Sequence, residues 1–86
     1  MKGIIHNMNK LNIKINRLEM TCGACPSQWD AYTNSGDYIY IRYRFGSLTV
    51  SYNNKQIFQK NIGDSLDGCM STSEMLMYTG IIYIGK

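Results

Sequence analysis

Apolar and polar residues alternate along several stretches of the chain, which is the pattern of half-buried β-strands. The alternation first appears in residues 11–16, "LNIKIN", where every second residue is apolar. The apolar positions then shift by one residue, to Leu18 and Met20. Because such a shift moves side chains to the other face of a sheet, the pattern predicts a strand with a bulge or bend near Arg17.

The middle of the chain predicts an antiparallel meander of about four or five strands. The turn-like segment "NSGD" separates the first two strands. Asn53 and Asn54 can adopt the positive φ angles of a second tight hairpin turn. The predicted strands are residues 28–33, 38–45, 47–52 and 55–59.

The C-terminal part predicts one short helix followed by a short strand in "IIYIG". Ser71 can cap this helix while Glu74 reaches back to complete a capping box, and Gly80 suits a left-handed stop. The expected core contacts of the helix are Met75, Leu76 and Tyr78. We therefore expect a single domain, residues 1–86, of the α+β class: a small antiparallel sheet of four to six strands with one short C-terminal helix.

Size and composition favour a binding module over an enzyme. A chain of 86 residues has a marginal core, which leaves little room for a deep catalytic pocket. Charged residues make up only 17% of the chain and aromatic residues 12%, a balance typical of contact surfaces. The net charge of +3 is smaller than non-specific nucleic-acid binders usually carry, so a nucleic-acid partner is disfavoured.

The expected location is the cytoplasm. No stretch has the length and hydropathy of a transmembrane helix or a secretory signal, so no membrane partner is expected. Three cysteines, an odd number, fit a reducing compartment better than a disulfide framework. A small domain whose sheet has open edges can be a monomer or a homodimer.

The strand "YIYIRYRF", residues 38–45, has two different faces. Alternation places its isoleucines, Tyr43 and Phe45 in the core, and turns two tyrosines and two arginines outward. Tyrosine and arginine are enriched at binding hot spots. On the preceding strand we expect Trp29 to prefer the core. The predicted contact surface therefore consists of Tyr38, Tyr40, Arg42, Arg44, Gln28, Asp30 and Tyr32.

Two interpretations of this surface remain open. The arginines can grip phosphates or carboxylates while the tyrosines stack on planar rings. Alternatively, the surface is a solvated sheet face in which Arg42 or Arg44 forms an ion pair with Asp30 across the strands.

Cys22 and Cys25 form a C-x-x-C motif followed directly by Pro26. A redox dithiol needs its second cysteine in the first turn of a helix, but a following proline favours an extended conformation. A structural zinc site needs four ligands, and the remaining candidates are Cys69 and His6. We therefore expect no bound cofactor and interpret the cysteines as small buried residues at a corner between two strands. Zinc held by Cys22, Cys25, Cys69 and His6 is the alternative.

The segment from Asp67 to Glu74 has the spacing of the latter half of an EF-hand calcium loop. Its leading ligand positions, however, would be Gly63 and Ser65, and no helix is predicted before them. A turn followed by a capped helix explains these residues without calcium. With a single histidine, no nucleophile, histidine and acid arrangement can be argued from spacing, so we expect no catalytic residues.

The pattern "TCGACPSQWDA…GDYIYIRYRFGSLTV…GDSLDGCMSTSEML" resembles a small family of uncharacterised proteins from phages and prophages. These proteins share a T-C-x-x-C-P-x-Q-W corner, a Y-I-R-Y-R strand and a closing L-D-G segment. The resemblance covers roughly residues 20–76 and implies no enzymatic activity. What it implies is a bacteriophage gene product that acts inside a bacterial cell.

We therefore expect a phage-encoded, non-catalytic binding protein that inhibits a bacterial immune component by obstruction through its tyrosine and arginine face. Such an inhibitor would be of the anti-CRISPR type or a related anti-defence type, and its partner would be a host defence protein. One alternative is a sponge that sequesters a nucleotide immune signal on the same arginines. Another is a zinc-stabilised structural or nucleic-acid-binding module.

Overall fold

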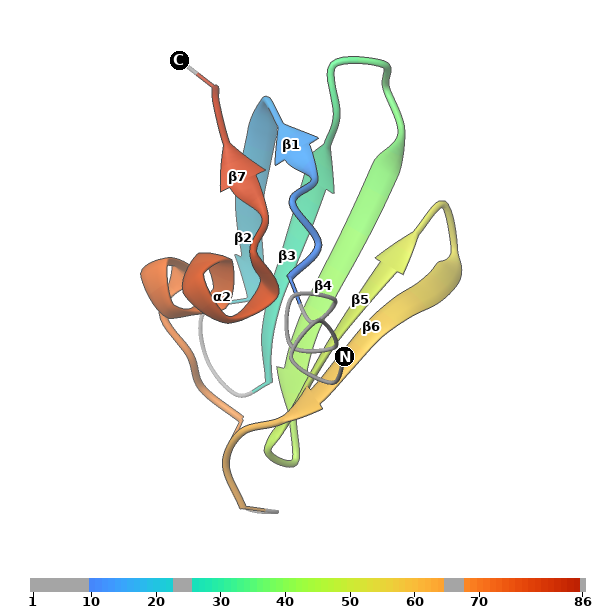
Figure 1. Ribbon diagram of the computed structural model, residues 1–86. Helices are drawn as coiled ribbons and strands as arrows, with labels where there is room; N and C mark the ends of the chain where they lie inside the picture. Colours follow the sequence, from blue (N-terminus) through green and yellow to red (C-terminus); the bar gives the residue numbers. More distant parts are fainter. Residues whose placement is uncertain (1–9, 23–25, 65–67, 86) are drawn as a thin grey trace, which may run out of the picture.

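The computed structural model describes residues 10–22, 26–64 and 68–85 (Figure 1). Its main element is a five-stranded sheet with the strand order β2-β3-β4-β5-β6. The strands are β2 (Arg17–Cys22), β3 (Ser27–Tyr32), β4 (Tyr38–Arg44), β5 (Ser47–Tyr52) and β6 (Lys55–Asn61). Each strand pairs antiparallel with the next one along the chain, which confirms the predicted meander.

Residues with positive φ angles form the tight turns of this meander. Asn53 and Asn54, at φ angles of 49° and 72°, join β5 to β6 as predicted. Phe45 and Gly46, at 55° and 76°, join β4 to β5. The prediction that Phe45 belongs to the core is wrong, because β4 ends at Arg44 and Phe45 is 64% exposed in the turn.

One face of the sheet forms the hydrophobic core. Every second residue of β3, β4 and β5 is buried on this face, and the strand register aligns these residues across the sheet. They are Trp29, Ala31, Ile39, Ile41, Tyr43, Leu48 and Val50. The alternation seen in the sequence therefore follows directly from burial of one sheet face.

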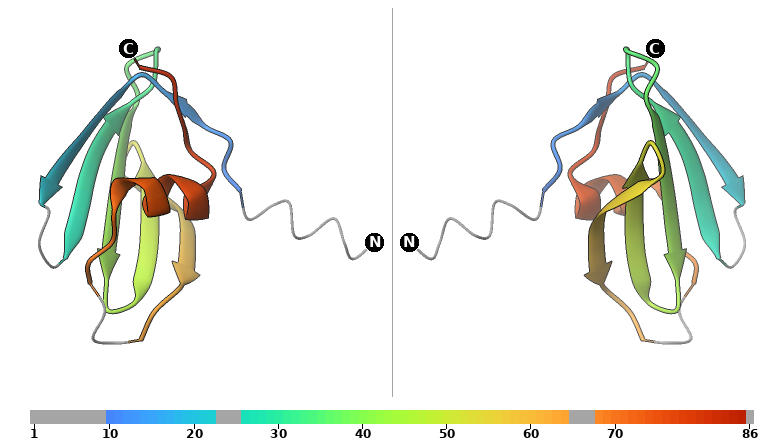
Figure 2. Two further views of the ribbon diagram at one scale, coloured as in Figure 1. Left: turned by 90° about the vertical axis from the view of Figure 1, so that its left-hand side faces the viewer. Right: turned by 90° about the vertical axis from the view of Figure 1, so that its right-hand side faces the viewer.

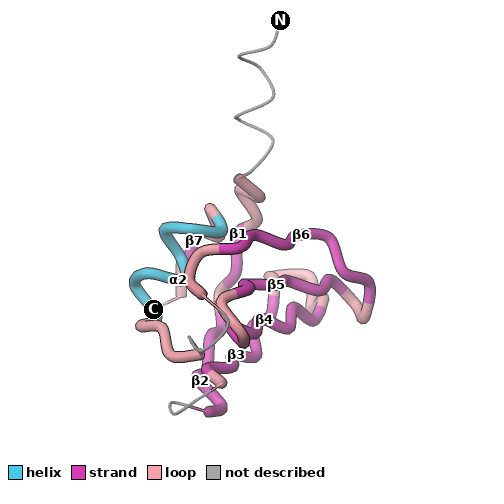
Figure 3. Tube along the Cα trace, turned by 90° about the horizontal axis from the view of Figure 1, so that it is seen from below, coloured by secondary structure: helices cyan, strands magenta, loops and turns pink. Residues whose placement is uncertain are grey.

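The buried face is covered by three further elements. They are helix α2 (Thr72–Thr79), strand β1 (Lys14–Ile15) and strand β7 (Ile82–Tyr83). All three lie on the same side of the sheet, as the views in Figures 2 and 3 show. Met75 of α2 is fully buried, and Leu76 and Tyr78 are partly buried against the core, which confirms the predicted helix contacts. The opposite face of the sheet is covered by no element of the described chain.

Helix α2 begins and ends as the local sequence predicts. The Ser71 hydroxyl accepts a hydrogen bond from the Glu74 amide and the Glu74 carboxylate accepts one from the Ser71 amide, each over 3.1 Å. Gly80 ends the helix in the left-handed conformation at a φ angle of 80°. The Trp29 indole nitrogen donates to the Thr72 hydroxyl over 2.9 Å. This bond fixes the first turn of the helix to β3.

Strands β1 and β7 form a separate two-stranded parallel sheet. The Ile82 amide donates to the Ile13 carbonyl over 2.8 Å. The chain bends at Asn16, between β1 and β2, which confirms the predicted bend near Arg17. A closing strand was predicted, but its parallel pairing joins segments from opposite ends of the chain, and no local pattern indicates such a pairing.

The described chain is thus mostly β-structure, with an antiparallel five-stranded meander and one short helix. The predicted small sheet with a short C-terminal helix is confirmed to that extent. In the parts of the chain that the structure describes, no helix is long and apolar enough to cross a lipid bilayer.

Candidate functional site

The uncovered side of the five-stranded sheet, which we call the open face, carries four rows of side chains. Residues opposite each other in an antiparallel pair project to the same face, so the register defines the rows. In order along the sheet, the rows are Arg17, Tyr32 and Tyr38; Glu19, Asp30, Tyr40, Ser51 and Gln56; Cys22, Gln28, Arg42, Thr49 and Gln59; and Arg44, Ser47 and Asn61. All of these residues are exposed or partly exposed, whereas their neighbours along β3 and β4 are buried.

All seven residues of the predicted contact surface lie on the open face. The reasoning that separated the two faces of β3 is also confirmed, because Trp29 is fully buried on the opposite face. Neighbouring strands add residues to this face that were not predicted to belong to a contact surface. They are Arg17, Glu19 and Cys22 of β2, Ser47, Thr49 and Ser51 of β5, and Gln56, Gln59 and Asn61 of β6. The alternation in "SLTVSY" could have predicted the three β5 residues, because it places Leu48 and Val50 in the core and the hydroxyl side chains on the opposite face.

Tyrosine rings and a carboxylate form one end of the open face. The Tyr38 hydroxyl donates to Asp30 over 2.7 Å, and this hydrogen bond raises the pKa of Tyr38 to about 12. The ring centroids of Tyr32 and Tyr38 are 5.5 Å apart. The Arg17 guanidinium lies 4.9 Å from the centroid of the Tyr32 ring, within the range of a cation–π interaction. The Tyr38 ring is therefore fixed in position by its hydrogen bond to Asp30 and its contact with Tyr32.

The loop between β3 and β4 is fixed by Asp37. Its carboxylate accepts hydrogen bonds from the Tyr52 hydroxyl over 2.6 Å and from the Asn53 side-chain amide over 3.1 Å. Both hydrogen bonds lower the pKa of Asp37, and the bond from Tyr52 has the larger effect. These contacts connect the β3–β4 loop to the β5–β6 turn and so hold the edge of the open face in shape.

Two arginines form the other end of the open face. The predicted alternative, an ion pair of Arg42 or Arg44 with Asp30, is not formed, and the Asp30 carboxylate accepts the Tyr38 hydroxyl instead. Among the described residues, no acidic side chain forms an ion pair with either arginine. The Arg44 guanidinium lies 4.5 Å from the ring centroid of Phe45. The positive charge of this end is therefore not neutralised by ion pairs in the described chain.

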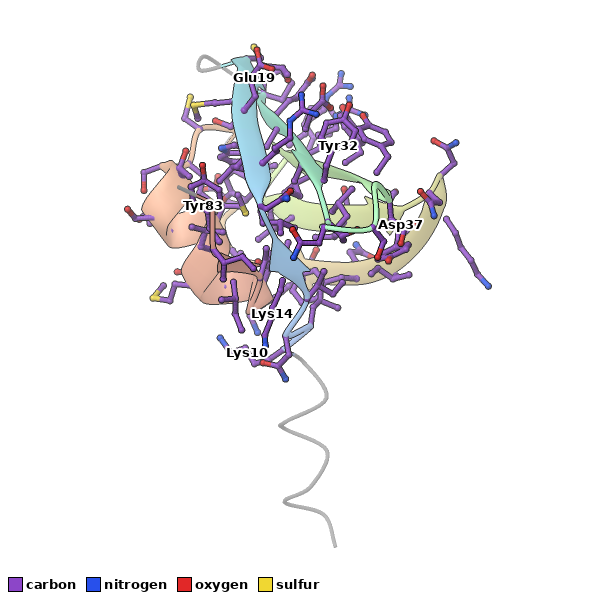
Figure 4. All side chains as sticks on the ribbon, turned by 90° about the horizontal axis from the view of Figure 1, so that it is seen from above. Lys10, Lys14, Glu19, Tyr32, Asp37 and Tyr83 are labelled. Atoms are coloured by element: carbon purple, nitrogen blue, oxygen red, sulfur yellow. The ribbon has the colours of Figure 1, made fainter. Side chains whose placement is uncertain are left out.

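A shallow depression of about 260 Å³ lies where β2 borders the open face. Asn16, Glu19, Asp30, Tyr32 and Tyr83 are among its lining residues. Figure 4 shows Tyr32 and Tyr83 on opposite sides of β2. Glu19 and Asp30 are directly opposite each other in the register, and Arg17 also lines the depression. The open face thus carries charges of both signs near β2 and two arginines near the β4–β5 turn.

The cysteines differ from their predicted role as buried residues at a corner. Cys22 is a partly exposed free thiol, while Cys69 is exposed and disulfide-bonded. Cys25 lies outside the described residues. The Ser27 amide donates to the Gly68 carbonyl over 2.8 Å, so the segment around Cys69 lies beside the start of β3. The prediction that Cys69 is a buried thiol is therefore wrong, because Cys69 is at the surface in a disulfide bond. The expectation that the cysteines indicate a reducing compartment is wrong for the same reason, since one of them forms a disulfide.

The alternative zinc site required thiolates at all three cysteines together with His6. A disulfide-bonded Cys69 supplies no thiolate, and Cys25 and His6 lie outside the described residues. Within residues 10–22, 26–64 and 68–85, no three histidine, cysteine or acidic side chains are grouped as a metal site requires. Of the calcium-loop positions considered above, Ser65 and Asp67 also lie outside the described residues, and Glu74 caps α2.

Comparisons of the chain with protein-family models, with curated proteins and with solved structures found no match. Function must therefore be argued from the geometry and chemistry of the open face.

Proposed function

We propose that the protein is a phage-encoded, non-catalytic binding protein that inhibits a bacterial immune component. In this proposal the open face covers a surface that the target needs for its activity. The chain then acts in the bacterial cytoplasm, as anti-CRISPR and related anti-defence inhibitors do, and its partner is a host defence protein.

The observation that carries this proposal is a sheet face with contact-forming side chains and no covering element in the described chain. Tyr32, Tyr38 and Tyr40 present large rings that are only partly exposed. Tyrosine and arginine are the residues that contribute most at binding hot spots, because they combine a large contact area with hydrogen bonding. Arg42 and Arg44 add positive charge, and a partner that carries carboxylates or phosphates can meet this charge without breaking an existing ion pair.

The open face is also rigid enough to bind without much loss of conformational entropy. From Ile39 to Tyr43, strand β4 pairs with β3 on one side and with β5 on the other. The hydrogen bond from Tyr38 to Asp30 and the stacking of Arg17 on Tyr32 hold side chains in place. Preorganised groups of this kind give more affinity per contact, since less ordering is needed on binding.

The bacterial setting of the proposal rests on the resemblance to phage and prophage proteins. Two of the three motifs of the resemblance can be located on the fold, and the first, the cysteine corner, ends at Trp29, which is in the core and contacts α2. The Y-I-R-Y-R strand is β4, which places Arg42 and Arg44 on the open face. One motif thus supports the fold and the other supports the surface that we propose as the contact site.

The proposal can be tested with bacterial strains that each carry one defined immune system. Expression of the chain is expected to restore phage plating in at least one strain and to leave a strain without the system unchanged. With purified components, inhibition of the target is expected to be complete at an equimolar amount of the chain, because a binding protein acts by occupancy. Inhibition that continues at a small fraction of the target concentration would indicate turnover and contradict the proposal. So would a failure to restore plating in every strain.

A further inference from the structure

The basic end of the open face contains a groove on the β4–β5 hairpin. The groove has a volume of about 240 Å³, and its lining residues are Arg42, Arg44, Phe45, Ser47 and Thr49. Arg42 pairs with Thr49 and Arg44 pairs with Ser47 in the strand register. Two arginines on one strand therefore face two hydroxyl groups on the next, in a square array on a single sheet face.

Two polar groups of this array have hydrogen-bonding capacity that the described chain does not use, whereas the Thr49 hydroxyl donates to the Arg42 carbonyl over 3.4 Å. The Nε atom of Arg42 is buried and has no hydrogen-bond partner among the described residues. A buried donor without a partner costs free energy until an acceptor arrives. The Ser47 hydroxyl accepts a hydrogen bond from the Gln59 side-chain amide over 3.1 Å, which leaves its own proton to be donated.

The electrostatics of the groove favour an anion. Its two charged side chains are both arginines, and neither forms an ion pair in the described part of the chain. The acidic residues of the open face, Glu19 and Asp30, lie toward β2, and Asp30 is already bonded to Tyr38. A guanidinium presents several N–H donors in a fixed plane, which matches the oxygens of a phosphate group.

We propose that this groove binds a phosphate group, held by Arg42 and Arg44 and by the hydroxyl of Ser47. The inference rests on the proposed function, since it identifies the chemistry that the open face recognises. The Arg42 guanidinium supplies one positive charge, and its buried Nε atom gains the missing acceptor when the side chain turns toward a phosphate oxygen in the groove. Arg44 supplies the second positive charge, and its position over the Phe45 ring keeps the guanidinium at the rim of the groove.

The size of the groove indicates how such a ligand would lie. Pockets that enclose a drug-sized ligand have volumes of roughly 300–1,000 Å³, and the groove at about 240 Å³ is smaller. It therefore has room for a phosphate or pyrophosphate group but not for a whole drug-sized ligand, whose remainder lies over the open face. The exposed Phe45 ring lines the groove, and Tyr40 is the next open-face residue along β4 from Arg42.

Titration calorimetry with inorganic pyrophosphate tests the proposal. The wild-type chain is expected to bind pyrophosphate saturably. The Arg42→Ala/Arg44→Ala variant is expected to bind about tenfold more weakly or worse, the loss that accompanies removal of charge-assisted hydrogen bonds. The matched control is Lys55→Ala/Lys60→Ala, which removes the same charge from exposed positions on β6 and should leave binding unchanged. Absence of saturable binding, or an equal loss in the control, would overturn the proposal.

A second variant keeps the test decisive if the arginine variant folds poorly. Ser47→Ala removes the donor hydroxyl and keeps both arginines, and it is expected to weaken pyrophosphate binding several-fold, about as one lost hydrogen bond predicts. Pyrophosphate binding as tight as that of the wild type would show that the Ser47 hydroxyl is not part of the site. Adenosine triphosphate is titrated in parallel. If adenosine triphosphate binds more tightly than pyrophosphate, the source of the phosphate is a nucleotide. If the two bind equally, the source is a free polyphosphate.

Failure of the phosphate proposal can be distinguished from failure of the proposed function. A chain that restores phage plating but does not bind pyrophosphate retains its inhibitory face, and only the phosphate chemistry is wrong. A chain that binds pyrophosphate but restores plating in no strain has the phosphate site without the proposed role as an inhibitor.

Discussion

Replacing Gly46 by alanine is expected to destabilise the protein far more than the same replacement at Gly36. Both glycines have positive φ angles, 76° at Gly46 and 88° at Gly36. A Cβ atom at Gly36 would have nothing within 4 Å. A Cβ atom at Gly46 would overlap the main-chain carbonyls of Gly63 and Asp64, and it would lie 2.6 Å from the carbonyl carbon of Gly63.

The magnitudes follow from these two environments. The left-handed conformation costs an alanine about 1–2 kcal/mol at either site. At Gly46 the overlap must also displace residues 62–64, whose position depends on hydrogen bonds from the Ile62 and Gly63 amides to the Gly46 carbonyl, at 2.8 and 3.2 Å. Each bond contributes about 0.5–1.5 kcal/mol. Gly46→Ala should therefore cost about 2–5 kcal/mol, a large part of the stability of a small domain.

Urea denaturation of the wild-type chain and the two variants measures these costs directly. We expect Gly36→Ala to lower the free energy of unfolding by about 1–2 kcal/mol and Gly46→Ala to lower it by clearly more. Because the turn carries Phe45 and leads into Ser47, the Gly46 variant should also bind pyrophosphate more weakly. Equal destabilisation by the two variants would refute the reasoning, since the φ angle alone would then account for both.

Three further changes have expected outcomes. Trp29→Phe removes the indole hydrogen bond to α2 and leaves unfilled space in the core, so the free energy of unfolding should fall by about 1–3 kcal/mol in urea denaturation. The hydrogen bond to Asp30 raises the pKa of Tyr38 from 10.0 to about 12. The stability linked to this shift is therefore fully present below pH 10 and lost as the pH rises through about 12. Tyr38→Phe should make stability less dependent on pH in this window, and a late tyrosinate absorbance change should disappear. Cys69→Ser should lower the free energy of unfolding by about 2–4 kcal/mol under oxidising conditions only, whereas Cys22→Ser should have little effect because Cys22 is a free thiol.

Much of the fold follows from local sequence patterns, and the exceptions have physical causes. The turn at Asn53–Asn54 and the capping box at Ser71 and Glu74 depend on neighbouring residues, so the sequence predicts them. Phe45 continues the alternation of β4 by one residue, yet the tight turn requires two residues with positive φ angles, and Phe45 is one of them. Parallel pairing of β1 with β7 joins distant segments and is decided by packing on the core, which no local pattern encodes.

The same distinction applies to the candidate site. Period-two alternation was enough to assign the seven predicted residues to one face, because burial decides which side of a strand faces the core. It was not enough to predict the partner of Asp30. On the neighbouring strand, Asp30 is directly opposite Tyr40 and has Tyr38 and Arg42 as diagonal neighbours. Only the three-dimensional structure shows that the Tyr38 hydroxyl is the group that reaches it.

Charge reversal on the two faces of the sheet tests the role of the open face most directly. The assay is phage plating in the strain whose immune system the wild-type chain inhibits. We expect Arg42→Glu/Arg44→Glu to abolish inhibition, and Lys55→Glu/Lys60→Glu to retain it, because Lys55 and Lys60 register with core-side residues on the edge strand β6. Circular dichroism and urea denaturation confirm that both variants are folded. Full inhibition by a folded Arg42→Glu/Arg44→Glu variant, or equal loss in both variants, would contradict the assignment of the open face as the contact surface.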